Sequence, residues 1–146
     1  VVVFRDDEVL LVRHGSKAGH VKDSLGIPSG RIELDENKNL LETVLQASSR
    51  ELTEETGYGV DEVDLMEFEG NHFEADIPRS DGTIKRMSWE VFIAQKMRGE
   101  MREGNDETTP EWHKLSELDD LELLPNVKNA IINAQKFLLS DRHYGK

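Results

Sequence analysis

The chain has 146 residues, of which 36% are hydrophobic and 33% are charged, and its formal net charge is −12. This length suits one domain with a single core, spanning residues 1–146. The excess of acidic side chains argues against a nucleic acid polymer as partner, because nucleic-acid-binding proteins hold phosphates with a basic surface. A small phosphorylated substrate remains compatible with this charge if metal ions screen the acidic groups.

Two further features of the composition narrow the class of protein. The sequence contains no cysteine, so it has no disulfide framework and nothing in it points to secretion. It has no apolar run of about 18 residues and no signal-like start, so we expect no membrane association and a cytoplasmic location. The chain opens on Val1 within a strand-like run, from which we expect the natural amino terminus to lie further upstream.

The first quarter of the chain predicts a hairpin followed by a basic loop. Residues 1–4 and 9–12 are β-branched and aliphatic runs on either side of an acidic turn, as in two antiparallel strands. The loop at 13–22 contains Arg13 and Lys17, which are natural donors to phosphate groups. We expect these two side chains to bind substrate, with an ordinary solvated loop as the alternative.

Residues 40–56 have the pattern of a helix that ends at Gly57, where a left-handed C-cap belongs. Asn39 is a favourable N-cap, and Glu42, three residues later, can return a hydrogen bond to the cap. Apolar and small residues fall on one stripe of this helix, namely Leu41, Leu45, Ser48 and Leu52.

Three glutamates share one face at the end of this helix. Glu51, Glu54 and Glu55 lie within an arc of roughly 100°, because each residue advances by about 100° around the axis. Mg²⁺ prefers oxygen ligands and is typically held by a few carboxylates together with substrate phosphates. The pattern therefore indicates a metal site, with a solvated acidic helix face as the alternative.

The remaining elements predict how this helix is packed. Residues 61–69 alternate as a strand, and 85–96 have apolar residues on both faces, as in a central strand. Residues 126–139 carry apolar residues at helical spacing and predict an amphipathic helix that packs on the sheet. Together they fit an α/β/α sandwich on a mixed β-sheet.

The glutamate-bearing stretch resembles the Nudix box. The carboxyl-terminal half of that motif matches at every defined position: Arg50, Glu51, Leu52, Glu54, Glu55, Gly57 and Tyr58. The amino-terminal half matches as Gly30, five residues and Glu36, but thirteen residues then precede Arg50 where the family has seven. The chain thus carries six extra residues, and counting seven back from Arg50 reaches Glu42 instead.

We expect Glu36 to be the first glutamate of the box and Glu42 to be a capping residue, with part of the insertion inside the helix around residues 46–49. On this interpretation Glu36→Gln is more harmful than Glu42→Gln.

The resemblance implies the Nudix fold and hydrolysis of a diphosphate joined to another moiety, giving two phosphorylated products. Mg²⁺ or Mn²⁺ would be held by the three helix glutamates. The carbonyl oxygen of Ser29 would be a further ligand, because Ser29 stands where the family usually has the first of two glycines after a proline. Arg50 would orient Glu36 or a helix glutamate through a forked ion pair.

The resemblance also implies a base that takes a proton from water, either Glu51 or an acid in the loop before Trp112. Spacing favours Asp106 or Glu107, with Glu111 as the remaining candidate. The substrate would be a small nucleoside diphosphate derivative, and the oligomeric state stays open, with a homodimer as one alternative. A Nudix-fold module that binds a nucleotide without cleaving it is the other interpretation of the whole chain.

Overall fold

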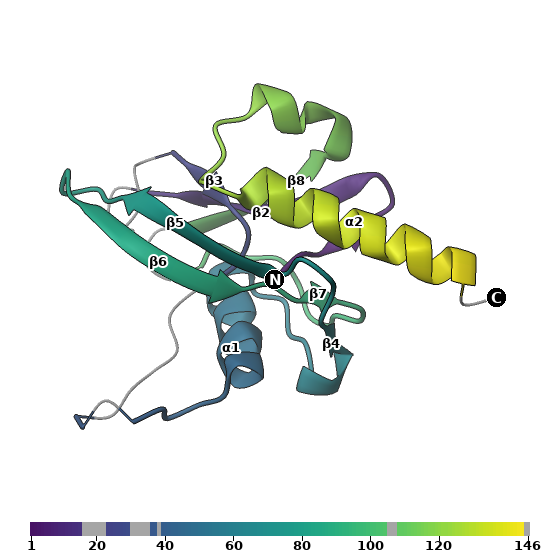
Figure 1. Ribbon diagram of the computed structural model, residues 1–146, viewed down its shortest axis with the longest axis horizontal. Coiled ribbons are helices and arrows are strands. Elements are labelled where there is room, and N and C mark those ends of the chain that lie inside the picture. The colour runs from purple at the N-terminus through teal and green to yellow at the C-terminus, as the bar shows by residue number, and fades with distance from the viewer. Residues whose placement is uncertain (16–22, 30–35, 38, 105–107, 145–146) are drawn as a thin grey trace.

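The central sheet of the protein is built around one long strand. The computed structural model describes residues 1–15, 23–29, 36–37, 39–104 and 108–144. Strand β2 (Glu8–His14) pairs antiparallel with β1 (Phe4–Arg5), β3 (Leu25–Gly26) and β8 (Thr108–Lys114) (Figure 1). The β1–β2 connection confirms the predicted amino-terminal hairpin, in which Phe4 lies opposite Val9.

Four other strands of the described chain form two separate two-stranded sheets. Strand β4 (Leu65–Met66) pairs with β7 (Ile93–Ala94), and β5 (His72–Pro78) forms a hairpin with β6 (Ile84–Glu90). A parallel bridge between Val2 and Ile93 joins the start of the chain to β7. The backbone N–H of Val2 donates to the carbonyl of Phe92 at 2.8 Å across this bridge. Antiparallel and parallel pairings therefore coexist, as the predicted mixed sheet requires.

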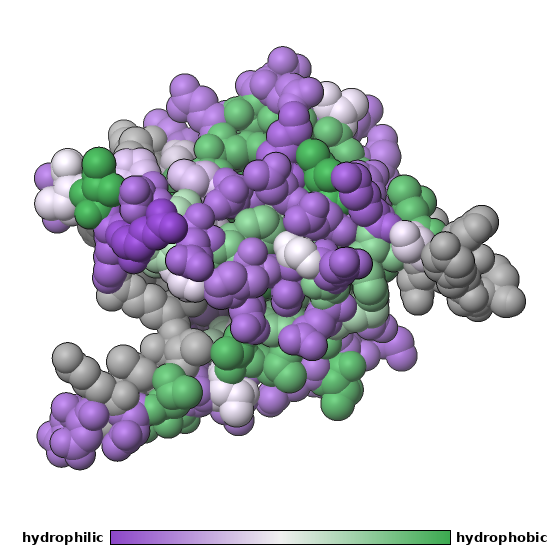
Figure 2. All heavy atoms as spheres, viewed as in Figure 1, coloured by the Kyte–Doolittle hydropathy of each residue, from purple (hydrophilic) through white to green (hydrophobic). Residues whose placement is uncertain are grey.

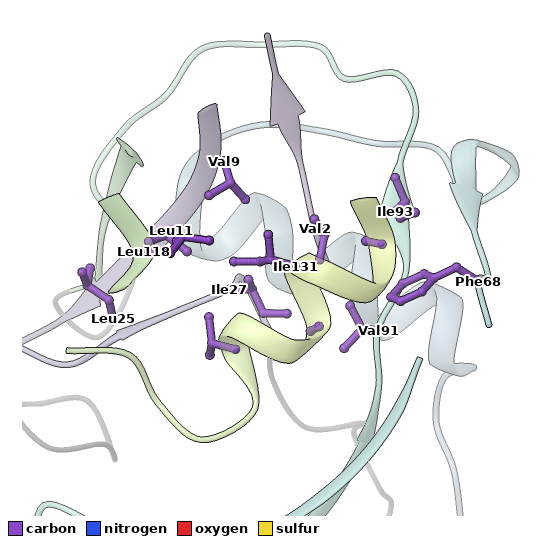
Figure 3. Close-up of a cluster of buried hydrophobic side chains, with 13 residues drawn as sticks. Val2, Val9, Leu11, Leu25, Ile27, Phe68, Val91, Ile93, Leu118 and Ile131 are labelled. Atoms are coloured by element: carbon purple, nitrogen blue, oxygen red, sulfur yellow. The ribbon is translucent and has the colours of Figure 1, made fainter. Parts of the chain in front are cut away.

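Two helices cover opposite faces of these strands. In Figure 1, α1 (Val44–Thr56) lies at the bottom of the molecule and α2 (Val127–Tyr144) runs across its upper half. Alternate residues of β2 enter separate cores: Val9 and Leu11 pack in a cluster with residues of α2, whereas Leu10 packs in a second cluster with Leu52 of α1. Figure 3 shows the first cluster, with the side chain of Ile131 from α2 close to Leu11. The predicted α/β/α sandwich is confirmed.

Two predicted strands are wrong in extent. The stretch 61–69 begins as a short 3₁₀ helix, η1 (Glu62–Asp64), and only Leu65–Met66 pairs as a strand. The stretch 85–96 divides into β6, which is mostly exposed and pairs with β5, and the short β7, so it is not one central strand. Only Val91, Phe92 and Ile93 are buried as expected. A second 3₁₀ helix, η3 (Leu115–Asp120), follows β8. Pairing partners rather than local pattern decide where these short strands end.

The predicted start of the glutamate-bearing helix is also wrong. Helix α1 begins at Val44, and its cap is Thr43, whose hydroxyl accepts from the backbone N–H of Gln46 at 3.1 Å. The Gln46 side chain returns a hydrogen bond to the Thr43 N–H at 2.8 Å, completing a capping box. Leu40 and Leu41 precede the helix and are exposed.

On the face seen in Figure 2, polar side chains predominate and apolar ones lie between them singly or in small groups. This agrees with the net charge of −12. Among the described residues, no helix is long and apolar enough to cross a lipid bilayer.

Candidate active site

The carboxyl-terminal half of α1 carries the predicted glutamate face. Leu52 is completely buried and anchors the opposite side of the helix in the core. The helix ends where predicted, because Gly57 adopts a left-handed conformation (φ 87°) and its N–H donates to the Thr53 carbonyl. Because Leu52 faces the core, Glu51 and Glu54 lie away from it. The helix thus places these glutamates as their spacing in the sequence predicts.

Arg50 is the centre of an ion-pair network beside these glutamates. Its guanidinium forms a forked pair with Glu42, through Nη2 to Oε1 at 2.6 Å and Nε to Oε2 at 3.0 Å. Its Nη1 also donates to Glu51 Oε1 at 2.7 Å and to Glu54 Oε2 at 3.1 Å. The Glu42 side chain is only 11% exposed. Two parallel hydrogen bonds fix both the distance and the orientation of the pair. Arg50 therefore connects Glu42, which precedes the helix, to the glutamate face of α1.

This network corrects the expected role of Glu42. Glu42 pairs with Arg50 and does not cap α1, since Thr43 occupies the capping position. Glu36 is exposed, and no contact between it and Arg50 occurs in the described part of the chain. Seven residues separate Glu42 from Arg50, which is the undisturbed spacing of the box. The geometry therefore favours an insertion ahead of Glu42 over the expected insertion within the helix.

Glu55 is the last carboxylate of the glutamate face along the helix. Its Oε1 accepts a hydrogen bond from the backbone N–H of Ser29 at 2.6 Å. Burial raises the pKa of Glu55 to about 8, against the lowering effect of that hydrogen bond. The non-glycine residues with positive φ in the described chain are Asp6, Asp23 and Asn126, so serine at position 29 meets no backbone penalty.

Glu51, Glu54 and Glu55 have the chemistry of ligands for a divalent cation. Burial also raises the pKa of Glu51, with the charge of neighbouring Glu54 acting in the same direction. Partly buried carboxylates that repel one another are stabilised by a cation, so the chemistry of these residues fits one. In the side-chain arrangement of the described residues, however, no group of three or more His, Cys, Asp or Glu side chains converges at metal-binding distance. The Arg50 guanidinium lies against the carboxylates of Glu51 and Glu54.

The basic residue expected to bind substrate is engaged elsewhere. Arg13 lies within β2, and the predicted loop begins only after His14. Its guanidinium forms a forked pair with Glu111 of β8, through Nε at 2.7 Å and Nη2 at 3.0 Å. Glu111 also accepts from His113 Nε2 at 2.7 Å. Glu111 is thus part of a cross-strand network. Lys17, Asp106 and Glu107 lie outside the described residues.

We expect Glu111→Gln to lower the free energy of unfolding by about 1 kcal/mol at neutral pH, a value reduced for partial exposure. The Arg13 hydrogen bond is the largest cause that lowers the pKa of Glu111. A depressed pKa stabilises the fold above the unfolded-state pKa, and this contribution disappears as pH falls through the folded-state pKa. Urea unfolding of both proteins at pH 7 and pH 3 checks this. A difference that persists unchanged at pH 3 would exclude the charged pair as its cause.

Two ion pairs of the structure were not predicted from the sequence, Glu42–Arg50 and Arg13–Glu111. The spacing between Glu42 and Arg50 carried a usable signal, because it equals that of the family motif. The Arg13–Glu111 pair had none, since it joins residues 98 positions apart through the β2–β8 register.

The protein thus combines an α/β/α sandwich with a glutamate-bearing helix whose arginine forms a forked ion pair, the arrangement expected from the motif. A family model described as the NUDIX domain matches residues 1–135, and the chain belongs to the Nudix family. This match supports the expected pyrophosphohydrolase class. A comparison with curated proteins gave no match.

Solved structures share the fold. One is the MutT NUDIX hydrolase from Burkholderia pseudomallei, with 22% identity, coverage of 90% of this chain and 92% of that chain, and a TM-score of 0.65. The NUDIX domain of Shewanella oneidensis NrtR, complexed with ADP ribose, has 18% identity, coverage of 94% and 82%, and a TM-score of 0.68. A C. elegans Ap4A hydrolase has 15% identity, coverage of 95% and 93%, and a TM-score of 0.61.

Proposed function

We propose that this protein is a metal-dependent hydrolase that cleaves a diphosphate linkage in a nucleoside diphosphate derivative and releases two phosphorylated products. The observation that carries the proposal is the α1 face, where Glu51 and Glu54 meet Arg50 and Glu55 meets the Ser29 N–H. Neighbours of the same fold include a domain complexed with ADP ribose and an Ap4A hydrolase, which supports nucleotide derivatives as the substrate class.

The residues that would hold Mg²⁺ or Mn²⁺ are Glu51, Glu54 and Glu55, with the Ser29 carbonyl as a further oxygen ligand. A bound metal would neutralise charge on the diphosphate and lower the pKa of a water molecule. Glu51 would accept the proton of that water at a carboxylate oxygen. The loop acid Glu107 stays a second candidate for this role.

Arg50 and Glu42 orient this face without touching substrate. The forked pair holds the Arg50 guanidinium, and Nη1 then positions the carboxylates of Glu51 and Glu54. We propose that Glu42, in place of Glu36, is the first glutamate of the box. Arg13 is less suited to phosphate binding than expected, because Glu111 already occupies its fork, and Lys17 remains a candidate for that role.

The test is product release across a panel of diphosphate compounds, with Mg²⁺, with Mn²⁺ and with a chelator. The panel contains ADP-ribose, a dinucleoside polyphosphate, a coenzyme A derivative and deoxynucleoside triphosphates. Phosphomonoester products are detected through an added phosphatase, and pyrophosphate from the triphosphates through an inorganic pyrophosphatase. We expect metal-dependent cleavage of at least one compound, and cleavage that persists in chelator would contradict the metal assignment.

A catalytically silent nucleotide-binding module is the second candidate. It is favoured by the side-chain arrangement of the described residues, in which no group of three or more His, Cys, Asp or Glu side chains converges at metal-binding distance. Silence across the panel, combined with a compound that raises the melting temperature, would select this function. Cleavage of any compound would exclude it.

The remaining parts of the proposal concern context. We propose a single domain over residues 1–146 and a small phosphorylated substrate as the partner. The cysteine-free and acidic composition supports a cytoplasmic location and argues against nucleic acid polymers.

A further inference from the structure

A segment downstream of the sheet runs past the carboxyl-terminal end of α1. Residues 98–104, here named the α1 clamp, begin with an antiparallel bridge in which Gly59 and Arg98 exchange hydrogen bonds of 2.9 and 3.0 Å. The clamp then turns under the helix, where the backbone N–H of Arg102 donates to the Thr56 carbonyl at 2.8 Å. Thr56 is the last residue of α1, so its carbonyl has no hydrogen-bond donor within the helix.

Arg102 also covers the helix end with its side chain. Its Nη2 donates to the Thr53 carbonyl at 3.3 Å. A Cβ added to Gly57 would lie 2.5 Å from Arg102 Cγ and 2.5 Å from the Glu100 carbonyl oxygen, so the clamp contacts the C-cap directly. The last turn of α1 contains no basic residue. Arg102 therefore supplies from outside the positive charge that a helix carboxyl terminus favours.

Gly104 brings the clamp against the backbone of Glu55. A Cβ at position 104 would lie 2.5 Å from the Glu55 carbonyl oxygen and 2.6 Å from its Cα, and it would also meet the Thr108 hydroxyl. The Gly104 N–H donates to the Thr108 carbonyl at 2.8 Å, which fastens the clamp to the first residue of β8. The backbone of Glu55 is thus held between its own helix and a strand of the central sheet.

We propose that the α1 clamp positions the glutamate-bearing turn of α1, and that Gly104 and Arg102 are its positioning residues. Glu55 reaches the Ser29 N–H at 2.6 Å, a contact that a displacement of its backbone would break. Functional carboxylates require placement within about 0.5 Å, so a side chain at position 104 impairs the site without touching substrate. The consequence for catalysis rests on the proposed function, whereas the placement of Glu55 does not.

The test compares Gly104→Ala with Gly82→Ala. Gly82 lies in the β5–β6 turn with φ +87° and has no atom within 4 Å of an added Cβ, so its variant controls for the cost of replacing a glycine. Three quantities are measured: the Ser29 amide chemical shifts in metal-free protein, the Mn²⁺ dissociation constant by electron paramagnetic resonance, and kcat and KM. We expect Gly104→Ala alone to move the Ser29 amide and to weaken Mn²⁺ binding about tenfold. We also expect it to lower kcat more than it raises KM.

Equal Ser29 shifts and equal Mn²⁺ affinities in the two variants would overturn the clamp. If the wild type cleaves nothing in the panel, the proposed function fails while the amide and Mn²⁺ measurements still decide the clamp. Should Gly104→Ala not fold, Arg102→Ala replaces it, with Arg86→Ala on exposed β6 as its control. Arg102→Ala keeps the backbone bond to Thr56, so we expect a smaller change in the same direction, and no change would overturn the proposal.

Discussion

Glu55→Gln is expected to reduce turnover by at least about a hundredfold with little loss of folded protein, because a lost metal ligand mainly weakens charge stabilisation in the transition state. The substituted glutamine side chain retains an oxygen that can accept the Ser29 N–H, so the local backbone contact survives the substitution. The measurement is kcat on the substrate identified by the panel, at saturating Mg²⁺. Glu74→Gln on exposed β5 is the matched control and is expected to keep full activity.

The same substitution is expected to lower activity but to raise the stability of the metal-free protein at alkaline pH. Burial raises the pKa of Glu55 from 4.5 to about 8, so the charged carboxylate costs folding free energy progressively as pH rises through that window. A neutral glutamine avoids this cost. In metal-free buffer we expect the melting temperature of Glu55→Gln to match the wild type near pH 4 and to exceed it at pH 8. In the kcat measurement, near-full activity of Glu55→Gln would show that α1 takes no part in the mechanism.

Glu42→Gln is expected to lower kcat at least tenfold, whereas Glu36→Gln is expected to leave it nearly unchanged. This reverses the order that the motif spacing from Gly30 predicts. The reason is the forked pair, in which both Glu42 oxygens hold the Arg50 guanidinium that in turn contacts Glu51 and Glu54. Removing the charge from Glu42 frees Arg50 to reorient, and the two helix carboxylates lose their common partner.

Kinetics of both variants on the same substrate check this order, with melting temperatures to separate folding from catalysis. A larger effect from Glu36→Gln would return Glu36 to the position of the first box glutamate and would make the Glu42–Arg50 pair a purely structural contact. Equal and small effects of both would show that the Arg50 network does not position the helix face.

The sequence predicted those parts of the site that depend on contacts within one helix. Helical spacing alone places Glu51, Glu54 and Glu55 on one face, and a left-handed glycine alone ends the helix at Gly57. The same holds for the hairpin of β1 and β2 and for the amphipathic stripe of α2. In each case the interacting residues are neighbours along the chain, so local geometry is sufficient.

The start of α1 shows the limit of that reasoning. Asn39 and Thr43 are both suitable caps, each followed three residues later by Glu or Gln. Pattern could not choose between them, because both satisfy the same local rule. The choice of Thr43 leaves Glu42 outside the helix, where its side chain reaches Arg50.

By itself, then, the sequence determined the class of fold, the family and the face of α1 that carries the glutamates, since these follow from periodicity and from a local motif. Only the tertiary structure decided which glutamate pairs with Arg50, that Arg13 pairs with Glu111, and that Gly104 lies against Glu55. Strand register and chain reversal bring Arg13 to Glu111 and Gly104 to Glu55 over long separations. Glu42 lies only eight positions from Arg50, and it reaches Arg50 because α1 begins after it, at Val44. Burial of Glu55, and hence its raised pKa, is likewise a property of the packed molecule, because desolvation depends on every element that covers the side chain.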